Sequence, residues 1–116
     1  MIASSESAKR IDFGDGVWGE IVRDFDNPLI KRRELTIVIH HVGKPTPMRI
    51  NMRLTVSEKF GVPVQHVYVR KIKTEYGIGR STAVVHIYES VDRAKLFEPE
   101  YVIERNGGIN PFEEEE

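Results

Sequence analysis

Apolar and polar residues alternate along two early segments of the chain, as they do in β-strands that have one buried face. Residues 18–25 alternate moderately, and an Asn-Pro dipeptide at positions 27 and 28, typical of a turn, follows them. Residues 31–42 alternate more strongly, with leucine or isoleucine at positions 35, 37 and 39. We therefore predict two strands joined by a turn.

The strongest helical signal covers residues 47–60. Thr46 is a candidate N-cap, Pro47 suits the first helical position because its missing N–H would be unpaired there, and Gly61 is a typical left-handed stop. Apolar residues four positions apart are expected to form the buried stripe of this helix: Met52, Val56 and Phe60.

Residues 64–73 and 80–88 are rich in β-forming residues and predict a hairpin. Their connection contains Gly77 and Gly79, which permit positive φ angles and a close approach of the backbone to a flat or anionic partner. Four cations and one aromatic ring surround this turn: Arg70, Lys71, Lys73, Arg80 and Tyr76. Such a loop suits RNA contact, and a solvated surface hairpin is the plain alternative.

One short helix and one short extended piece are predicted near the C-terminus. Ser90 is a suitable N-cap for a helix over residues 91–97, which Pro99 prevents from continuing. Residues 101–104 are predicted to be extended. Together with the preceding segments, this pattern predicts four strands, two helices and this short extended piece.

The two ends of the chain lack a core-forming pattern. Residues 1–16 are rich in serine, glycine and charge, which predicts a flexible N-terminal arm. Asn-Gly-Gly at residues 106–108 breaks regular structure, and the four glutamates that follow at 113–116 repel one another. The predicted divisions are thus an arm, a domain over residues 17–107 and an acidic tail over residues 108–116.

Composition favours a single cytosolic domain. The chain has 116 residues, no cysteine, 40% hydrophobic residues, no apolar run of membrane-spanning length, and an N-terminus unlike a signal peptide. Its net charge of −1 hides a basic middle, because residues 23–80 hold twelve Lys or Arg against five Asp or Glu. Charges act over a screening length of about 8 to 10 Å, so this basic middle can attract a polyanion.

Catalytic motifs are absent from the sequence, which contains neither a Gly-X-Ser-X-Gly elbow nor a phosphate-binding Gly-Lys-Ser or Gly-Lys-Thr motif. The four histidines are predicted to be surface or hydrogen-bonded structural residues. His40 and His41 point to opposite faces if they lie on a strand, and RNA contact or stacking is their alternative role. Glu98 and Glu100 flank a proline and are predicted to lie on the surface at a helix end. A small-molecule enzyme is therefore the weaker hypothesis.

Five blocks, in order and at the right spacing, resemble the signatures of one ribosomal family. They are residues 27–34 (NPLIKRRE), 41–47 (HVGKPTP), 69–81 (VRKIKTEYGIGRS), 87–90 (IYES) and 98–101 (EPEY). The family is small-subunit ribosomal protein twenty-four of the archaeal and eukaryotic type, and the resemblance spans about residues 18–107. Four positions depart from the usual pattern: Val42 replaces proline, Met48 serine, Tyr76 phenylalanine and Ala83 glycine.

The resemblance implies an α+β domain, a mainly antiparallel sheet of about four strands with two helices packed on it. It also implies a structural constituent of the small ribosomal subunit that binds ribosomal RNA and supports subunit assembly and translation in the cytoplasm. Its partners would be small-subunit ribosomal RNA and neighbouring ribosomal proteins, with no membrane, no cofactor, no metal and no catalysis, and the free protein would be a monomer.

The RNA-binding candidates follow from this resemblance and from charge. Phosphate contacts are expected from Lys31, Arg32, Arg33, Lys44, Arg49, Arg53, Arg70, Lys71, Lys73 and Arg80, stacking from His41 and Tyr76, and loop shape from Gly77 and Gly79. Arg49 and Arg53 lie one helical turn apart, so helix and loop are expected to share one surface. A solvated charge is the alternative for each cation. A general RNA-binding module outside the ribosome is the alternative function, although the RRM order of aromatic residues is missing.

Overall fold

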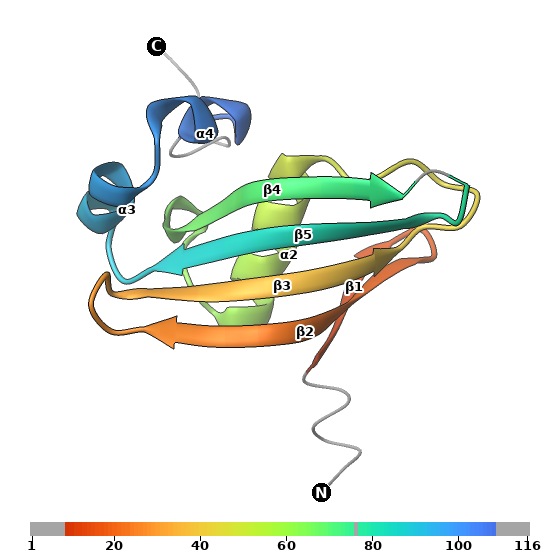
Figure 1. Ribbon diagram of the computed structural model, residues 1–116, viewed down its shortest axis with the longest axis horizontal. Helices are drawn as coiled ribbons and strands as arrows, with labels where there is room; N and C mark the ends of the chain where they lie inside the picture. Colours follow the sequence, from red (N-terminus) through yellow and green to blue (C-terminus); the bar gives the residue numbers. More distant parts are fainter. Residues whose placement is uncertain (1–8, 76, 109–116) are drawn as a thin grey trace, which may run out of the picture.

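The computed structural model of the chain describes residues 9–75 and 77–108, in which five antiparallel strands form one sheet and a helix crosses one of its faces (Figure 1). The strands are β1 (Arg10–Gly14), β2 (Val17–Asn27), β3 (Arg32–His40), β4 (Val67–Glu75) and β5 (Arg80–Tyr88). The helices are α2 (Arg49–Phe60), α3 (Val91–Phe97) and α4 (Glu100–Arg105), with a 3-10 turn at Val64–His66. The α+β class is confirmed, with one strand more than expected.

The strand order is β1-β2-β3-β5-β4. Consecutive hairpins connect β1 to β2, β2 to β3 and β4 to β5, whereas the chain passes from β3 to β4 through α2, which places β5 between them. The predictions for residues 1–8, for Tyr76 and for the acidic tail beyond residue 108 lie outside the described residues.

Strand β1 corrects the prediction of a flexible arm over residues 1–16. Arg10–Gly14 pairs with β2, and its Ile11 is only 1% exposed within the main core. The Asp12 carboxylate accepts a hydrogen bond from the Gly14 amide at 2.8 Å where the chain turns toward β2. A five-residue strand with one core residue is too short to show periodicity, and its stability comes from pairing with β2.

The main core lies between α2 and the sheet face that it covers. Leu35, Ile37 and Ile39 are buried there, as the alternation of residues 31–42 predicts. The helix contributes Met52 and Val56, which confirms the predicted apolar stripe, and Phe60 packs at its edge. The hairpin strands add alternate residues of the same face: Val67, Val69, Ala83, Val85 and Ile87.

Helix α2 ends as predicted but begins differently. Gly61 ends it in the left-handed conformation, with φ of 66°. The N-cap is Met48, which makes no side-chain cap, so the assignment of Thr46 and Pro47 to the helix start is wrong. The Thr46 hydroxyl instead lies 3.2 Å from that of Thr74. It therefore joins the loop before α2 to strand β4.

Helices α3 and α4 lie together at one end of the sheet (Figure 1). The Ser90 hydroxyl accepts a hydrogen bond from the Arg93 amide, which confirms the predicted cap of α3. The prediction of an extended piece at residues 101–104 is wrong, because Pro99 stops α3 and also begins α4. Asn106, after α4, pairs its side-chain amide with both backbone polar groups of Val69, at 2.8 and 3.0 Å. This pairing protects the exposed edge of β4.

Candidate nucleic-acid interface

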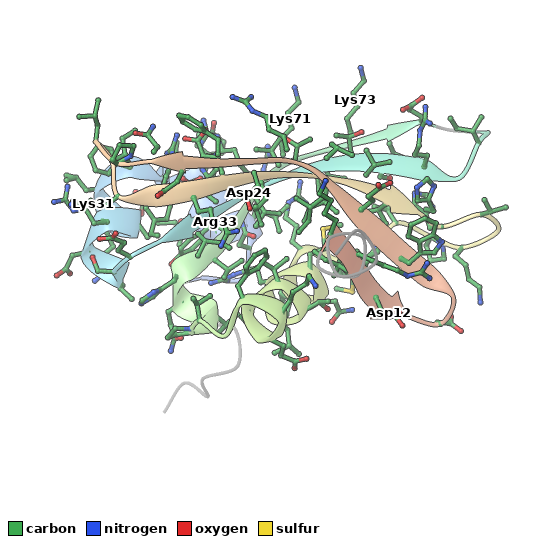
Figure 2. All side chains as sticks on the ribbon, turned by 90° about the horizontal axis from the view of Figure 1, so that it is seen from below. Asp12, Asp24, Lys31, Arg33, Lys71 and Lys73 are labelled. Carbon is green, nitrogen blue, oxygen red and sulfur yellow. The ribbon has the colours of Figure 1, made fainter. Side chains whose placement is uncertain are left out.

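The sheet face opposite α2, called here the open face, carries two of the predicted cations. Lys71 pairs with Val84 and Lys73 with Thr82, and both lysines project away from α2 (Figure 2). Both side chains are exposed. Neither ammonium group forms an ion pair with an acidic side chain among residues 9–75 and 77–108. Their charge is therefore available to a ligand.

A β-bulge in β4 points these lysines outward. The pairing with β5 shifts between Val69 and Lys71, so that Val69 and Ile72, three positions apart, both lie opposite core residues of β5. Strict alternation from Val69 would have turned Lys71 toward α2. The signal for the bulge is the spacing of apolar residues at 67, 69 and 72, which departs from a period of two.

The β4–β5 turn meets the loop that follows β3, which joins two sequence blocks separated by more than twenty residues. The His41 amide donates to the Gly79 carbonyl at 2.8 Å. Gly79 has φ of 63°, and a Cβ there would lie 2.6 Å from the Val42 Cα. Gly77, with φ of 95°, faces open space. Gly79 thus serves the contact between the two loops, and Gly77 serves only the turn.

The cations at this end of the sheet are partly engaged. Arg80 donates two hydrogen bonds to the Glu75 carboxylate, at 3.2 and 3.3 Å. Lys44 forms an ion pair with Asp15 at 3.2 Å. Both pairs are exposed, so water and salt screen them and an RNA phosphate can compete for either cation.

His41 does not fit its predicted role as a stacking residue. It is only 5% exposed, with Nδ1 3.0 Å from the Lys44 carbonyl and Nε2 2.7 Å from the Ser81 hydroxyl. Nδ1 therefore braces the loop internally, Nε2 holds the loop against β5, and the buried ring has no free face for a base. The other predicted stacker, Tyr76, lies outside the described residues.

Arg53 is likewise a structural residue, which corrects its assignment as a phosphate contact. Its guanidinium is fully buried over the Tyr68 ring. It donates to four backbone carbonyls, those of Val64, Val67, Asn106 and Gly108. Burial lowers the pKa of Arg53 to about 10, so the side chain stays charged at neutral pH. The expected surface shared by α2 and the loop therefore loses one of its two helical cations.

The cations of residues 31–33 lie at the opposite end of the sheet from the β4–β5 turn (Figure 1). Arg32 donates to Glu34 at 2.8 Å and to the Tyr88 hydroxyl at 2.9 Å, and Arg33 pairs with Asp24. The hydrogen bonds from Arg33 hold the pKa of the Asp24 carboxyl below its usual value. Lys31 occupies the turn with φ of 63° and is exposed. The predicted cations thus form two groups rather than one surface.

Arg49, at the first residue of α2, is half-buried. Its Nε is buried and makes no hydrogen bond with any of the described residues. The position of the guanidinium gives no support for a phosphate contact, and the prediction for Arg49 rests on its charge alone.

Arg70 and Arg32 both lie near a buried carboxylate, that of Glu98. Glu98 is 4% exposed, lies 3.0 Å from His86 Nδ1, and accepts from the Tyr88 hydroxyl. The Arg70 and Arg32 guanidinium groups lie 3.8 and 3.9 Å from its oxygens. Glu98 was predicted to be a surface residue, which is wrong, because partners from β3, β4 and β5 converge on it. No local sequence pattern predicts that these partners meet Glu98.

A second feature that sequence reasoning missed is a stack of flat groups on the open face. The rings of Trp18 and His40 stack with centroids 4.4 Å apart, and the Arg10 guanidinium lies 4.3 Å from the Trp18 ring centroid. The available signal was the position of Trp18 and His40 on the polar side of two alternating strands. Stacking is an alternative role for His40 in the sequence, but no local pattern identifies Trp18 as its partner.

The described residues contain no group of three or more His, Asp or Glu side chains arranged to hold a metal ion. Within the same residues, no helix is both long and apolar enough to cross a membrane.

Comparisons with known proteins agree with the resemblance in the sequence blocks. A family model described as "Ribosomal protein S24e" matches residues 17–107. A protein named small ribosomal subunit protein eS24 from Pyrobaculum arsenaticum is 46% identical over 83 residues, which cover 72% of this chain and 69% of the relative. A protein of the same name from Saccharolobus islandicus is 37% identical over 103 residues, which cover 89% and 86% of the two chains.

Proposed function

Because the chain belongs to the ribosomal protein S24e family and is a constituent of the small ribosomal subunit, we propose that it binds small-subunit ribosomal RNA through its open sheet face and the adjoining β4–β5 turn. Members of this family are structural proteins of the ribosome and not enzymes. In this proposal the protein enters the subunit in the cytoplasm as a monomer, and its rigid sheet supports assembly by fixing the fold of the RNA beside it.

The observation that carries this proposal is the pair of exposed lysines on β4. Lys71 and Lys73 lie two residues apart on one face, and neither is neutralised by an acidic side chain of the described residues. A lysine that contacts phosphate releases a condensed counterion, which favours binding. Arg32 and Arg33 are already paired within the protein, so the two lysines are the better candidates.

The β4–β5 turn extends this basic surface at the edge of the open face. The turn precedes Arg80, and Gly79 fixes its position because the Gly79 carbonyl accepts a hydrogen bond from the neighbouring loop. Arg80 pairs with Glu75 in the free protein. When RNA binds, a phosphate can replace the Glu75 carboxylate, so Arg80 keeps one anionic partner in both the free and the bound protein. Lys44 can make the same exchange from Asp15. Neighbouring ribosomal proteins are the further partners in this proposal.

The test compares single lysine variants with a matched control. Lys71→Gln and Lys73→Gln are each expected to weaken binding to small-subunit ribosomal RNA about three- to tenfold. Lys95→Gln removes the same charge from an exposed position on α3 and is expected to leave the affinity unchanged. The measurement is filter binding at fixed salt, with cosedimentation of the protein with small subunits as a second readout.

Equal affinities for all three variants and the parent would exclude the open face as the RNA-binding surface. Equal binding to unrelated RNA, without cosedimentation, would favour an RNA-binding role outside the ribosome.

A further inference from the structure

The stack on the open face consists of three flat groups from three neighbouring strands. Arg10 comes from β1, Trp18 from β2 and His40 from β3, and Trp18 pairs directly with His40 in the sheet. Trp18 lies between the other two side chains, with its ring 4.3 Å from the Arg10 guanidinium and 4.4 Å from the His40 ring. Trp18 and His40 are half-buried, whereas Arg10 is exposed. The stack therefore has one solvent-exposed member, Arg10.

The stack shares its face with a surplus of cations. Strand pairing places four basic residues there that have no acidic partner in the described ranges: Arg10, Arg23, Lys71 and Lys73.

The acids of this face are mostly engaged. Glu34 pairs with Arg32, Glu75 pairs with Arg80, and Asp12 accepts a hydrogen bond from the Gly14 amide. Glu20, opposite Arg10, and Asp12 are the exposed carboxylates of this face that form no ion pair within the described residues, against the four cations without an acidic partner. The charge of the face complements a polyanion.

We propose that the open face binds a single-stranded segment of RNA, with one base stacked on the Trp18 ring in the place of Arg10 and the following phosphates on Lys71 and Lys73. This inference rests on the proposed function and adds which form of RNA this face recognises. Bases of a duplex are already stacked on one another, so only an unpaired base can take this position.

Magnitudes favour the exchange of Arg10 for a base. An exposed contact between a cation and an aromatic ring shifts an equilibrium by about two- to fivefold. A base stacked on an aromatic side chain shifts it by about five- to 150-fold. The displaced guanidinium remains on a flexible side chain and can contact a phosphate. His40, stacked on the other face of Trp18, holds the indole in position.

The spacing of the strands agrees with a bound chain that crosses the sheet. Trp18 on β2 and Lys73 on β4 are separated by β3 and β5, which corresponds to about 15 Å at about 4.8 Å per strand. Half-buried Val38 and Thr82 line the face between them in the row of Lys73, and half-buried Val84 lies beside Lys71. None of these side chains carries a charge that would repel phosphate.

Trp18 is the only tryptophan in the sequence, so its fluorescence reports directly on this position. The parent protein is titrated with a single-stranded oligoadenylate of about ten nucleotides, within the range of single-strand binding sites, and with an RNA duplex of the same length. We expect the single strand to quench Trp18 fluorescence and the duplex to leave it nearly unchanged. Lys71→Gln with Lys73→Gln is expected to shift the titration to higher concentration with the same final quenching.

A variant separates stacking from charge. Trp18→Leu, followed by anisotropy of labelled RNA, is expected to lose at least about fivefold in affinity for the single strand and to keep its affinity for the duplex. Circular dichroism and thermal unfolding check its fold. If this variant does not fold, Trp18→Phe replaces it, with a smaller loss expected from its smaller ring.

Two failures are distinguishable. If the parent protein binds small-subunit ribosomal RNA but the single strand does not quench Trp18, the stacking site is wrong and the proposed function stands. If the parent binds no ribosomal RNA in the filter assay, the proposed function itself fails. Binding of a ribosomal protein to this face, with Trp18 fluorescence changing only in that complex, would also overturn the inference.

Discussion

Single charged residues have the largest structural roles where the sequence suggested solvent exposure. Arg53 reaches carbonyls before and within β4 and others after α4, and Glu98 collects donors from two side chains of β5. Both groups are buried and their partners come from other elements, although the Glu98 Oε1 atom accepts no hydrogen bond from the described residues. A buried charge is tolerated only with such partners, so these residues determine how α4 and β5 sit in the fold.

Replacement of Arg53 is predicted to destabilise the protein strongly. Arg53→Leu removes the donor for four carbonyls, all in buried or half-buried surroundings, and should lower the free energy of unfolding by about 3 kcal/mol or more. Arg49→Leu, one turn earlier on α2, is the matched control, with an expected change within about 1 kcal/mol. Urea unfolding measures both. Similar losses would mean that helix propensity, not the carbonyl contacts, decides the result.

Glu98 predicts a dependence of stability on pH. Burial disfavours its charged form, but the hydrogen bonds from His86 and Tyr88 outweigh this effect, and the pKa of Glu98 in the fold lies below its ordinary value of 4.5. Its contribution is therefore fully present above the unfolded pKa, near 4.5, and is lost as pH falls through the lower folded pKa.

Glu98→Gln tests this assignment because it keeps the shape and removes the charge. The parent is expected to be more stable than the variant by about 1 to 3 kcal/mol at neutral pH. The difference should shrink as the pH falls below about 4.5. Thermal unfolding of both proteins across this range measures it, and a difference independent of pH would assign the effect to packing.

At the scale of elements, the bulge in β4 and the contact between two loops shape the candidate interface. The bulge sets the side on which Lys71 emerges, and the amide of His41 bonded to Gly79 fixes the loop beside the β4–β5 turn. The side-chain amide of Asn106 accepts from the Val69 amide and donates to the Val69 carbonyl, on the side of β4 that faces away from β5. The edge strand that carries the two lysines is thus held rigidly by neighbours on both sides.

The two glycines of the turn are predicted to differ in tolerance to substitution. Alanine at either position is strained by the positive φ, by about 1 to 2 kcal/mol. Gly79→Ala also drives its Cβ to 2.6 Å from the Val42 backbone, so its loss of stability should exceed that of Gly77→Ala by at least about 1 kcal/mol. Urea unfolding of the pair measures the difference. Equal losses would show that the two loops separate at little cost.

At the scale of the whole molecule, the basic face works despite a net charge of −1. Arg10, Arg23, Lys71 and Lys73 lie on the open face without an acidic partner in the described residues, whereas much of the acidic charge pairs internally or lies in the C-terminal part of the sequence. Since potentials are screened within about 8 to 10 Å, RNA bound on this face responds to the local surplus.

Binding of small-subunit ribosomal RNA is accordingly predicted to weaken steeply with salt. For the double variant Lys71→Gln and Lys73→Gln, the slope of log affinity against log salt should be smaller by about 1.4 to 1.8, because each lost phosphate contact removes about 0.7 to 0.9. Filter binding over a range of salt concentrations measures the slope, with Lys95→Gln as the control. An unchanged slope would contradict phosphate contact by these lysines.

Local patterns determined most of the elements. Alternation in residues 31–42, the stop at Gly61, the cap at Ser90 and the hairpin near the glycines are each encoded within about ten residues, and the structure contains each of them. The order of the five sequence blocks was also sufficient to identify the family. These features depend on backbone preferences and on neighbours in the chain, which a single sequence displays.

Tertiary structure alone decided which polar residues face solvent. β1 forms because β2 offers it an edge, Arg53 and Glu98 are buried because their partners arrive from other elements, and His41 is locked by Ser81. The stack of Trp18 on His40 likewise depends on strand register. The positions of polar residues along the chain follow no periodic pattern that reveals their partners, because hydrogen bonds form between groups that the fold brings together from distant parts of the sequence.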